Sequence, residues 1–274
     1  MSSQTIAPNS GISDCCLSGH LHVGNPIGQE EALGGMTTYT TGDVKNKNKS
    51  ILFITDIFGY HLTNTRLLAD EYAKAGFYVY VPDLFDGDYV PEYVLDVVAP
   101  KDTAPPKSFT EKALSTAKAP FDLGPWVVKH REAVSLPLIK NAVEAIRADP
   151  ATGKLGAVGF CWGGRYAILL AHAGSQVDAA VAHHPSFLGL PDDVEPVAKP
   201  LAVTVGDKDS MLDQKGVAQL KEILTSKAGV PSEVTVYPGA HHGFTVRGDL
   251  NNETEREQKE QAAEQTIAWM RKYL

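Results

Sequence analysis

The residues that most clearly could carry out a reaction form a short glycine-rich segment, Gly-Phe-Cys-Trp-Gly at 159–163. It follows an apolar run and precedes a helical pattern, so it matches the Gly-x-nucleophile-x-Gly turn between a strand and a helix. The glycines are needed because a Cβ at either position would collide with neighbouring backbone. The turn would place the Cys161 sulfur at a helix N-terminus, which favours thiolate over thiol. Taken alone, the segment fits a buried, inert cysteine equally well.

Two later loops could supply the acid and the base that a cysteine nucleophile requires. An apolar run leads into an acidic loop with Asp207 and Asp209, and another leads into a loop with His241 and His242. Nucleophile, acid and histidine then follow in the chain order that this type of turn requires. Both loops come after strands, so they would reach the same edge of the sheet as the cysteine. Spacing alone leaves two candidates for each role.

Apolar runs of strand length alternate with helix-like periodicity along most of the chain. The runs that we expect to form strands are 36–41, 51–55, 77–81, 155–160, 179–182, 201–205 and 234–237. The expected helices are 62–75, 133–148, 164–173, 214–228 and 253–272. Several runs are continuous rather than alternating, which is typical of parallel strands buried on both faces. The sequence predicts an α/β fold with a mostly parallel, doubly wound sheet and helices on both faces.

One stretch, 84–125, interrupts the alternation of strands and helices. It holds six prolines and only a short helical piece. A long irregular insertion after a strand is typical of an active-site lid, and a surface excursion without function is the alternative. We expect a single domain over 1–274, with residues 1–30 as an N-terminal extension and 84–125 as a lid-like insertion.

The composition is that of an ordinary soluble globular protein, with 43% hydrophobic and 21% charged residues among 274. A net charge of −8 argues against nucleic acid or an anionic membrane as the main partner. The N-terminal segment has no basic start and no apolar core, so we expect no secretory signal. No apolar run approaches the ~20 residues that span a bilayer. Three cysteines, of which Cys15 and Cys16 are adjacent, indicate a reducing compartment. We expect a cytoplasmic monomer or homodimer.

Several motifs together resemble the dienelactone hydrolases (carboxymethylenebutenolidases), which are α/β-hydrolases that use cysteine in place of serine. They are GFCWGG at 159–164, GDKD at 206–209, PGAHHGF at 238–244, ITDIFGY at 54–60 and VPDLFDGD at 81–88. The resemblance covers roughly residues 30–274, and CCLSGHLHVGNPIG before it is similar to an extension of fungal members. It implies the α/β-hydrolase fold, a small-molecule ester or lactone substrate, and no cofactor.

The resemblance also implies roles for individual residues, carried over position by position. The nucleophile falls on Cys161, the acid on Asp209 and the base on His242. The oxyanion hole falls on the backbone N–H groups of Trp162 and Ile57.

Two departures from the family pattern concern the surroundings of the nucleophile. The family has a glutamate that interacts with the resting thiol, whereas this chain has Asp56, which is one methylene shorter. The family binds its substrate carboxylate with arginines; Arg247 lies one residue beyond the expected place, and no second arginine is clear. These departures favour a substrate other than dienelactone. Tyr60 and His184 are further candidates for substrate contacts, with buried packing and a structural role as their respective alternatives.

Three other functions compete with an ester or lactone hydrolase. The same triad could serve a thioesterase or lactonase that acts on a secondary-metabolite or polyketide intermediate. A non-catalytic hydrolase-fold protein is less consistent with an intact triad. A metal site would use the clustered Cys15, Cys16, His20 and His22, but adjacent cysteines strain tetrahedral ligation and no second ligand pair follows. We therefore expect no metal.

Overall fold

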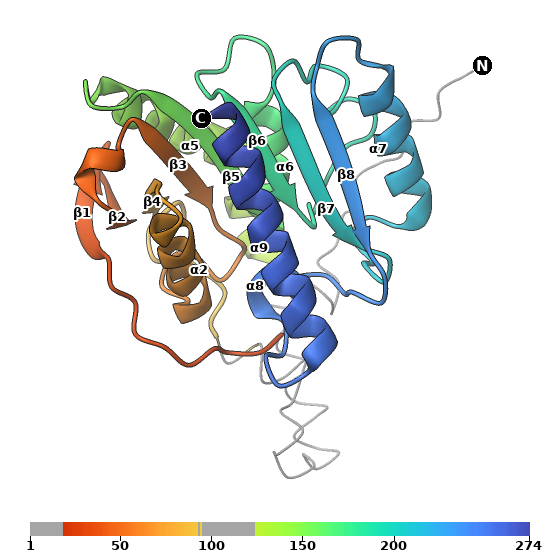
Figure 1. The fold of residues 1–274 in the computed structure, drawn as a ribbon, viewed down its shortest axis with the longest axis horizontal. Helices are drawn as coiled ribbons and strands as arrows, with labels where there is room; N and C mark the ends of the chain where they lie inside the picture. The colour runs from red at the N-terminus through yellow and green to blue at the C-terminus, as the bar shows by residue number, and fades with distance from the viewer. Residues whose placement is uncertain (1–18, 93, 95–123) are drawn as a thin grey trace.

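The computed structural model describes residues 19–92, 94 and 124–274, which build one eight-stranded sheet flanked by helices (Figure 1). The strands are β1 (Gln29–Leu33), β2 (Met36–Thr41), β3 (Lys49–Ile54), β4 (Tyr78–Pro82), β5 (Lys154–Phe160), β6 (Ala179–His183), β7 (Leu201–Gly206) and β8 (Ser232–Tyr237). The named helices are η1 (Val44–Asn46), α2 (Thr63–Lys74), α5 (Glu132–Ala148), α6 (Trp162–Leu170), α7 (Gln214–Ser226), α8 (Phe244–Arg247) and α9 (Glu253–Tyr273). Most of the predicted insertion 84–125 lies outside the described residues.

The sheet is parallel over most of its width. Its strand order is β1-β2-β4-β3-β5-β6-β7-β8, and all neighbours from β4 to β8 pair in parallel. At one edge of the sheet, β1 pairs antiparallel with β2, and β2 pairs antiparallel with β4. In Figure 1, α2 and α9 cross the near face of the sheet while α5 and α6 lie behind it. The predicted fold class, a mostly parallel sheet with helices on both faces, is confirmed.

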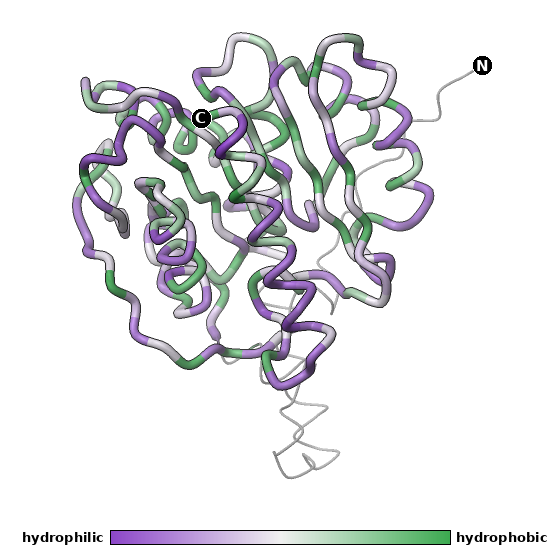
Figure 2. Tube along the Cα trace, viewed as in Figure 1, coloured by the Kyte–Doolittle hydropathy of each residue, from purple (hydrophilic) through white to green (hydrophobic). Residues whose placement is uncertain are grey.

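The central strands are buried on both faces, which explains their continuous apolar runs. Every residue of β6 and β7 is buried, as is every residue of β3 and β5 after the first. Figure 2 shows hydrophobic residues concentrated along these strands, whereas α9 is largely hydrophilic. Removing this apolar surface from water is the main force that holds the layers together.

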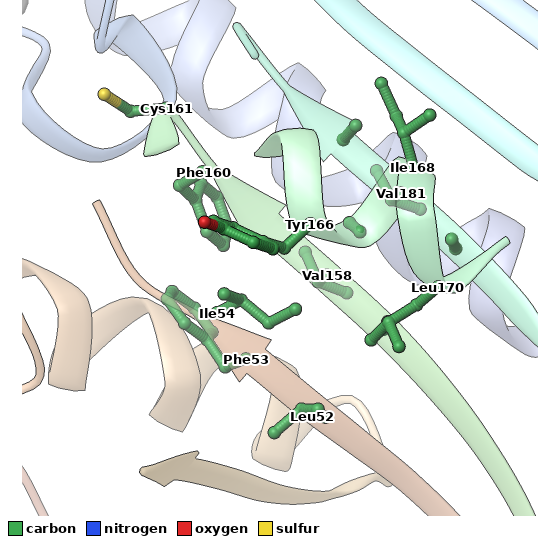
Figure 3. Close-up of a cluster of buried hydrophobic side chains, with 14 of the residues drawn as sticks. Leu52, Phe53, Ile54, Val158, Phe160, Cys161, Tyr166, Ile168, Leu170 and Val181 are labelled. Carbon is green, nitrogen blue, oxygen red and sulfur yellow. The ribbon is translucent and has the colours of Figure 1, made fainter. Parts of the chain in front are cut away.

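The packed core reaches up to the turn that carries Cys161. Phe53 of β3 and Phe160 of β5 stack with their ring centroids 4.4 Å apart. In Figure 3 the two rings lie with Val158 inside the core, and Cys161 lies just beyond them with its sulfur directed away from the cluster. The core therefore fixes the backbone of the turn, and the thiol lies on the side of the turn that faces away from the core.

One strand was not predicted. All seven expected strands overlap observed ones, but β1 precedes them and pairs with β2 across the turn formed by Gly34 and Gly35. Both glycines have positive φ, 55° and 81°, which other residues adopt only with strain. β1 shows no apolar run because four of its five residues are exposed at the sheet edge. The sheet thus begins at Gln29, inside the segment 1–30 that we expected to be an extension.

Candidate active site

Cys161 occupies a strained turn between β5 and α6. Its φ of 53° and ψ of −114° lie in a region that L-residues with a side chain rarely adopt. A Cβ on Gly159 would overlap the carbonyl oxygen of Gly163, and a Cβ on Gly163 would overlap that of Ile54. The two glycines flanking the predicted motif are therefore required by close backbone packing, as the sequence suggested.

The last residue of β6 and the loop that follows hold the backbone of Cys161 through its N–H and its carbonyl oxygen. The Cys161 N–H donates to the carbonyl oxygen of His183 at 3.1 Å and to His184 Nδ1 at 3.2 Å. The Cys161 carbonyl oxygen accepts the N–H of Ser186 at 3.0 Å. These bonds satisfy backbone groups that would otherwise be buried without partners, and they stabilise the strained turn.

A buried chain of side-chain contacts joins Cys161 to an acid through Ser186. Ser186 Oγ lies 3.3 Å from Cys161 Sγ and 3.2 Å from His242 Nε2. His242 Nδ1 lies 2.8 Å from Asp209 Oδ2, and both of these side chains are fully buried. Because the carboxylate accepts the Nδ1 proton, Nε2 of the neutral ring faces the serine and the cysteine as an acceptor.

The structure distinguishes the two candidates that spacing left open for each of the acid and the base. Asp209 is buried, and its second carboxylate oxygen accepts the Met211 N–H at 2.8 Å. Asp207 instead accepts the N–H of Gly239 at 2.6 Å, and His241 is exposed. Only Asp209 and His242 of the four join the contact chain that leads to the thiol.

Two backbone N–H groups lie at the edge where an oxyanion would form. Trp162 is the first residue of α6, and Ile57 follows β3, the strand next to β5. Gly163 N–H donates to the Thr55 carbonyl oxygen at 3.2 Å, which holds the loop after β3 against the start of α6. Between described residues, no hydrogen bond uses the N–H of Trp162 or Ile57. Both groups remain available as donors, as an oxyanion hole requires.

Asp56 forms a fully buried ion pair with Arg247 of α8. Asp56 also accepts the Phe58 N–H at 3.0 Å, and the Arg247 guanidinium lies 5.0 Å from the centre of the Phe58 ring. Burial raises the pKa of the Asp56 carboxyl, and the nearby Cys161 acts in the same direction, whereas Arg247 opposes the rise. Arg247, a candidate for contact with the substrate, is thus paired with a carboxylate of the protein.

His184 lies inside the protein rather than on an open surface. Its Nδ1 accepts from Cys161 N–H, and its Nε2 lies 2.7 Å from Thr245 Oγ1. Its ring centre is 4.9 Å from that of His242. Burial, followed by the neighbouring His242, holds the pKa of His184 well below its usual range, so the ring is neutral. The structural role, the alternative to substrate contact for this residue, fits these contacts.

Tyr60 is also buried, with 3% of its surface exposed. The Arg66 guanidinium lies 5.1 Å from its ring centre, and the His61 ring is 4.1 Å away. Burial raises the pKa of the Tyr60 phenol. These contacts match the packing interpretation of Tyr60.

Cys15 and Cys16, half of the considered metal cluster, lie outside the described residues. Within the described ranges, no group of three or more His, Cys, Asp or Glu is arranged to hold a metal ion. His22 is buried, and its Nε2 lies 2.8 Å from the Gly248 carbonyl oxygen.

Among the residues that the structure describes, every helix is too short or too polar to cross a bilayer.

Ser186 is the main feature of the site that the sequence did not reveal as an individual residue. It follows β6 on the same sheet edge as the other loops, two residues after His184. A hydroxyl after a central strand in the order His-His-Pro-Ser was the available signal, but serine is too common in loops to stand out.

A cysteine on a strained strand–helix turn, with an acid after β7 and a histidine after β8, defines an α/β-hydrolase site. The sequence model described as the dienelactone hydrolase family matches residues 36–274. The chain belongs to the dienelactone hydrolase family, as its motifs predicted.

Relatives of similar length support this assignment. The chain is 30% identical over 263 residues to the hydrolase pyvD of Aspergillus violaceofuscus, covering 96% of this chain and 97% of the relative. It is 28% identical over 269 residues to the hydrolase tropI of Talaromyces stipitatus, with 95% and 96% covered. It is 30% identical over 261 residues to a Gibberella moniliformis protein named dienlactone hydrolase 1, with 93% and 92% covered.

Solved structures show the same fold. A Klebsiella pneumoniae chain solved as a candidate dienelactone hydrolase superposes with a TM-score of 0.66 at 21% identity, over 90% of this chain and 99% of that one. The dienelactone hydrolase of Anabaena variabilis superposes with a TM-score of 0.54 at 18% identity, over 90% and 97%. At such identities the likeness concerns the fold alone.

Proposed function

We propose that this hydrolase cleaves an ester or lactone bond in a small molecule through a thioester intermediate on Cys161. His242 serves as the general base and Asp209 orients it. The observation that carries the proposal is the buried chain of contacts from Cys161 Sγ through Ser186 Oγ and His242 to Asp209. Membership of the dienelactone hydrolase family supports the same chemistry.

Acylation begins when His242 takes the proton of the Cys161 thiol. The thiolate forms a bond to the carbonyl carbon, and the electron pair of the C=O double bond moves to oxygen. The N–H groups of Trp162 and Ile57 stabilise this oxyanion. When the C=O bond re-forms, the bond from carbon to the alkoxide breaks, and the imidazolium of His242 protonates the leaving alkoxide. In a lactone, the leaving alcohol stays attached to the acyl group.

Deacylation repeats these steps with water as the nucleophile. His242 removes a proton from water, and the hydroxide adds to the thioester carbonyl while the same N–H groups stabilise the second oxyanion. Collapse breaks the carbon–sulfur bond, and the thiolate recovers its proton from His242. Asp209 stabilises the positive charge of the imidazolium in both halves of the cycle, which is the role of the acid in such triads.

The helix that starts at Trp162 helps to make the thiol acidic enough for this chemistry. Cys161 is the N-cap of α6, so the positive end of the helix dipole and the N–H of Trp162, the first residue of the helix, lie next to it. Thiols at helix N-termini have lowered pKa values for this reason. The Asp56–Arg247 pair nearby carries no net charge when both groups are ionised, so Arg247 offsets part of the repulsion between the Asp56 carboxylate and the thiolate.

Replacement of the nucleophile tests the proposal. Cys161→Ala should abolish hydrolysis of p-nitrophenyl acetate and inactivation by iodoacetamide, while circular dichroism and the melting temperature show a folded protein. Mass spectrometry of the wild-type enzyme quenched during turnover should show an acyl adduct on the peptide that contains Cys161. Hydrolysis at the wild-type rate by Cys161→Ala would refute the assignment.

A substrate panel separates the ester or lactone hydrolase from a thioesterase with the same triad. Turnover would be compared for p-nitrophenyl esters, aliphatic and aromatic lactones, and acyl thioesters of equal chain length. We expect kcat/KM to be highest for the oxygen esters or lactones. A clear preference for acyl thioesters would support the thioesterase alternative, and no turnover of any substrate would support a non-catalytic protein.

A further inference from the structure

We propose that Ser186 is a fourth catalytic residue, whose hydroxyl couples the protonation of Cys161 to that of His242. This inference rests on the proposed function, because it assigns a role within the same site. Ser186 is fully buried, and its Oγ lies within hydrogen-bond distance of the reacting sulfur and of the base at once. A hydroxyl in this place can pass a proton between the two groups.

The chemistry of a hydroxyl suits this position. A serine hydroxyl offers one donor and two acceptor lone pairs, and it rotates to suit its neighbours. In the resting state, the Cys161 S–H donates to Ser186 Oγ while the Ser186 O–H donates to His242 Nε2. In the ionised state, the His242 Nε2–H donates to Ser186 Oγ while the Ser186 O–H donates to the thiolate. The hydroxyl therefore serves both states without moving its oxygen.

The proton step balances. The S–H bond of Cys161 breaks and leaves its electron pair on sulfur, while Ser186 Oγ gains that proton. The original O–H bond of Ser186 breaks, and its proton forms a bond to His242 Nε2. The products are a thiolate, an unchanged serine and an imidazolium, whose charge Asp209 stabilises at 2.8 Å.

The fold keeps the Ser186 hydroxyl in place relative to the nucleophile. The N–H of Ser186 donates to the carbonyl oxygen of Cys161 at 3.0 Å, so the two residues share a backbone hydrogen bond. The preceding His184, with an unusual φ of 35°, holds the Cys161 N–H from the other side. Pro185 packs so closely against α6 that a Cβ on Gly164 would lie 3.0 Å from the proline Cα. These contacts fix the backbone from which the Ser186 side chain reaches the sulfur.

A serine that only fills space would not need these partners. Ser135, which is also buried, donates instead to the His130 backbone carbonyl at 3.0 Å, a bond typical of serine in loops and helix termini. Ser186 Oγ contacts the two side chains that must exchange a proton. A measurement that follows the ionisation of Cys161 can therefore distinguish a catalytic role of Ser186 from a packing role.

The test measures the pH dependence of Cys161 alkylation by iodoacetamide, together with kcat and KM for p-nitrophenyl acetate. A hydrogen bond to a charged group contributes about 1.5–3 kcal/mol, so Ser186→Ala should lower kcat about 10- to 100-fold. KM should change little. Loss of a donor to the thiolate should move the midpoint of the alkylation profile to higher pH. Ser186→Thr keeps the hydroxyl and should return that midpoint toward the wild-type value.

Ser50→Ala is the matched control. Ser50 is buried near the start of β3, at the opposite end of that strand from Ile57, and its hydroxyl donates to the Lys47 carbonyl oxygen at 2.8 Å. Ser50→Ala should leave the alkylation profile and kcat unchanged. A Ser186→Ala protein with the wild-type profile and kcat would overturn the role of Ser186, as would a Ser186→Thr protein whose midpoint matches that of Ser186→Ala. Loss of activity in Cys161→Ala would still support the triad in either case, so the two proposals fail separately.

Discussion

At the scale of single residues, the Asp56–Arg247 pair determines the charge beside the nucleophile. Both side chains are fully buried, and a Cβ on Gly243 would overlap the Arg247 guanidinium. The absence of a side chain at Gly243 thus makes room for the arginine to reach an aspartate that is one methylene shorter than the glutamate of the family pattern. A substrate carboxylate that approached Arg247 would have to compete with Asp56.

Removal of the Asp56 charge should lower the stability of the folded protein, because its buried partner Arg247 keeps its charge. Asp56→Asn leaves the guanidinium of Arg247 buried with a neutral partner, and breaking such a pair typically costs about 3–5 kcal/mol. Urea denaturation should show this loss in the free energy of unfolding at pH 7.

An exposed ion pair provides the comparison for this change. Glu30 and Arg66 lie 2.6 Å apart, but the glutamate is 45% exposed, so Glu30→Gln should change stability by less than about 1 kcal/mol. If Asp56→Asn were no more destabilising than Glu30→Gln, the buried pair would contribute little to the fold.

At the scale of elements, the site is made by the loops that follow four neighbouring parallel strands. β5, β6, β7 and β8 lie side by side, so their carboxyl ends meet at one edge and bring Cys161, Ser186, Asp209 and His242 together. The tightest of these connections is the turn from β5 to α6. Its geometry depends on glycine because the neighbouring β3 backbone leaves no room for a Cβ.

Because the turn depends on glycine, the addition of a single methyl group to it should lower both stability and activity. Gly163→Ala places a Cβ against the carbonyl oxygen of Ile54, which is backbone and cannot rotate away. Overpacking of this kind costs about 1–3 kcal/mol, and a shift of the turn would also displace the thiol from Ser186. The melting temperature and kcat should both fall.

Gly124→Ala is the matched control for this methyl group. A Cβ at Gly124 would meet nothing within 4 Å, and its φ is not in the left-handed region. Gly124→Ala should leave the melting temperature unchanged, because the added methyl group meets no other atom. A Gly163→Ala protein that behaved like Gly124→Ala would show that the turn can relax without cost.

At the scale of the whole molecule, the strands and the order in which the cysteine, acid and histidine loops follow them could be predicted from the sequence, because both depend on local patterns. Continuous apolar runs mark buried parallel strands, and glycines mark the turn. β1 escaped prediction because an exposed edge strand needs no apolar run. The Arg247–Asp56 pair and the contacts of Ser186 escaped as well, because they join residues 191 and 25 positions apart in the sequence. No local pattern encodes such contacts.

A second set of long-range contacts places neutral histidines in the core. His183, at the end of β6, lies with Nδ1 2.5 Å from Thr204 Oγ1 and Nε2 2.8 Å from Thr266 Oγ1. Its ring stacks on Phe160 with centroids 4.7 Å apart. Burial lowers the pKa of His183 to about 3. The network thus links β6, β7 and α9 through a ring that must stay uncharged.

This histidine makes stability depend on pH in a definite direction. The pKa of histidine in an unfolded chain is about 6.5, so between that pH and about 3 the unfolded state binds a proton that the folded state does not. The contribution of His183 is fully present above pH 6.5 and is lost as the pH falls, by up to about 1.4 kcal/mol per pH unit. Urea denaturation at pH 7.0, 6.0 and 5.0 should show this decline, and His183→Gln should make it shallower even if that variant is less stable at pH 7. The exposed His61 gives the control, since His61→Gln removes no buried ring and should keep the wild-type slope. Equal slopes for the wild type and His183→Gln would mean that other groups govern the sensitivity of the fold to acid.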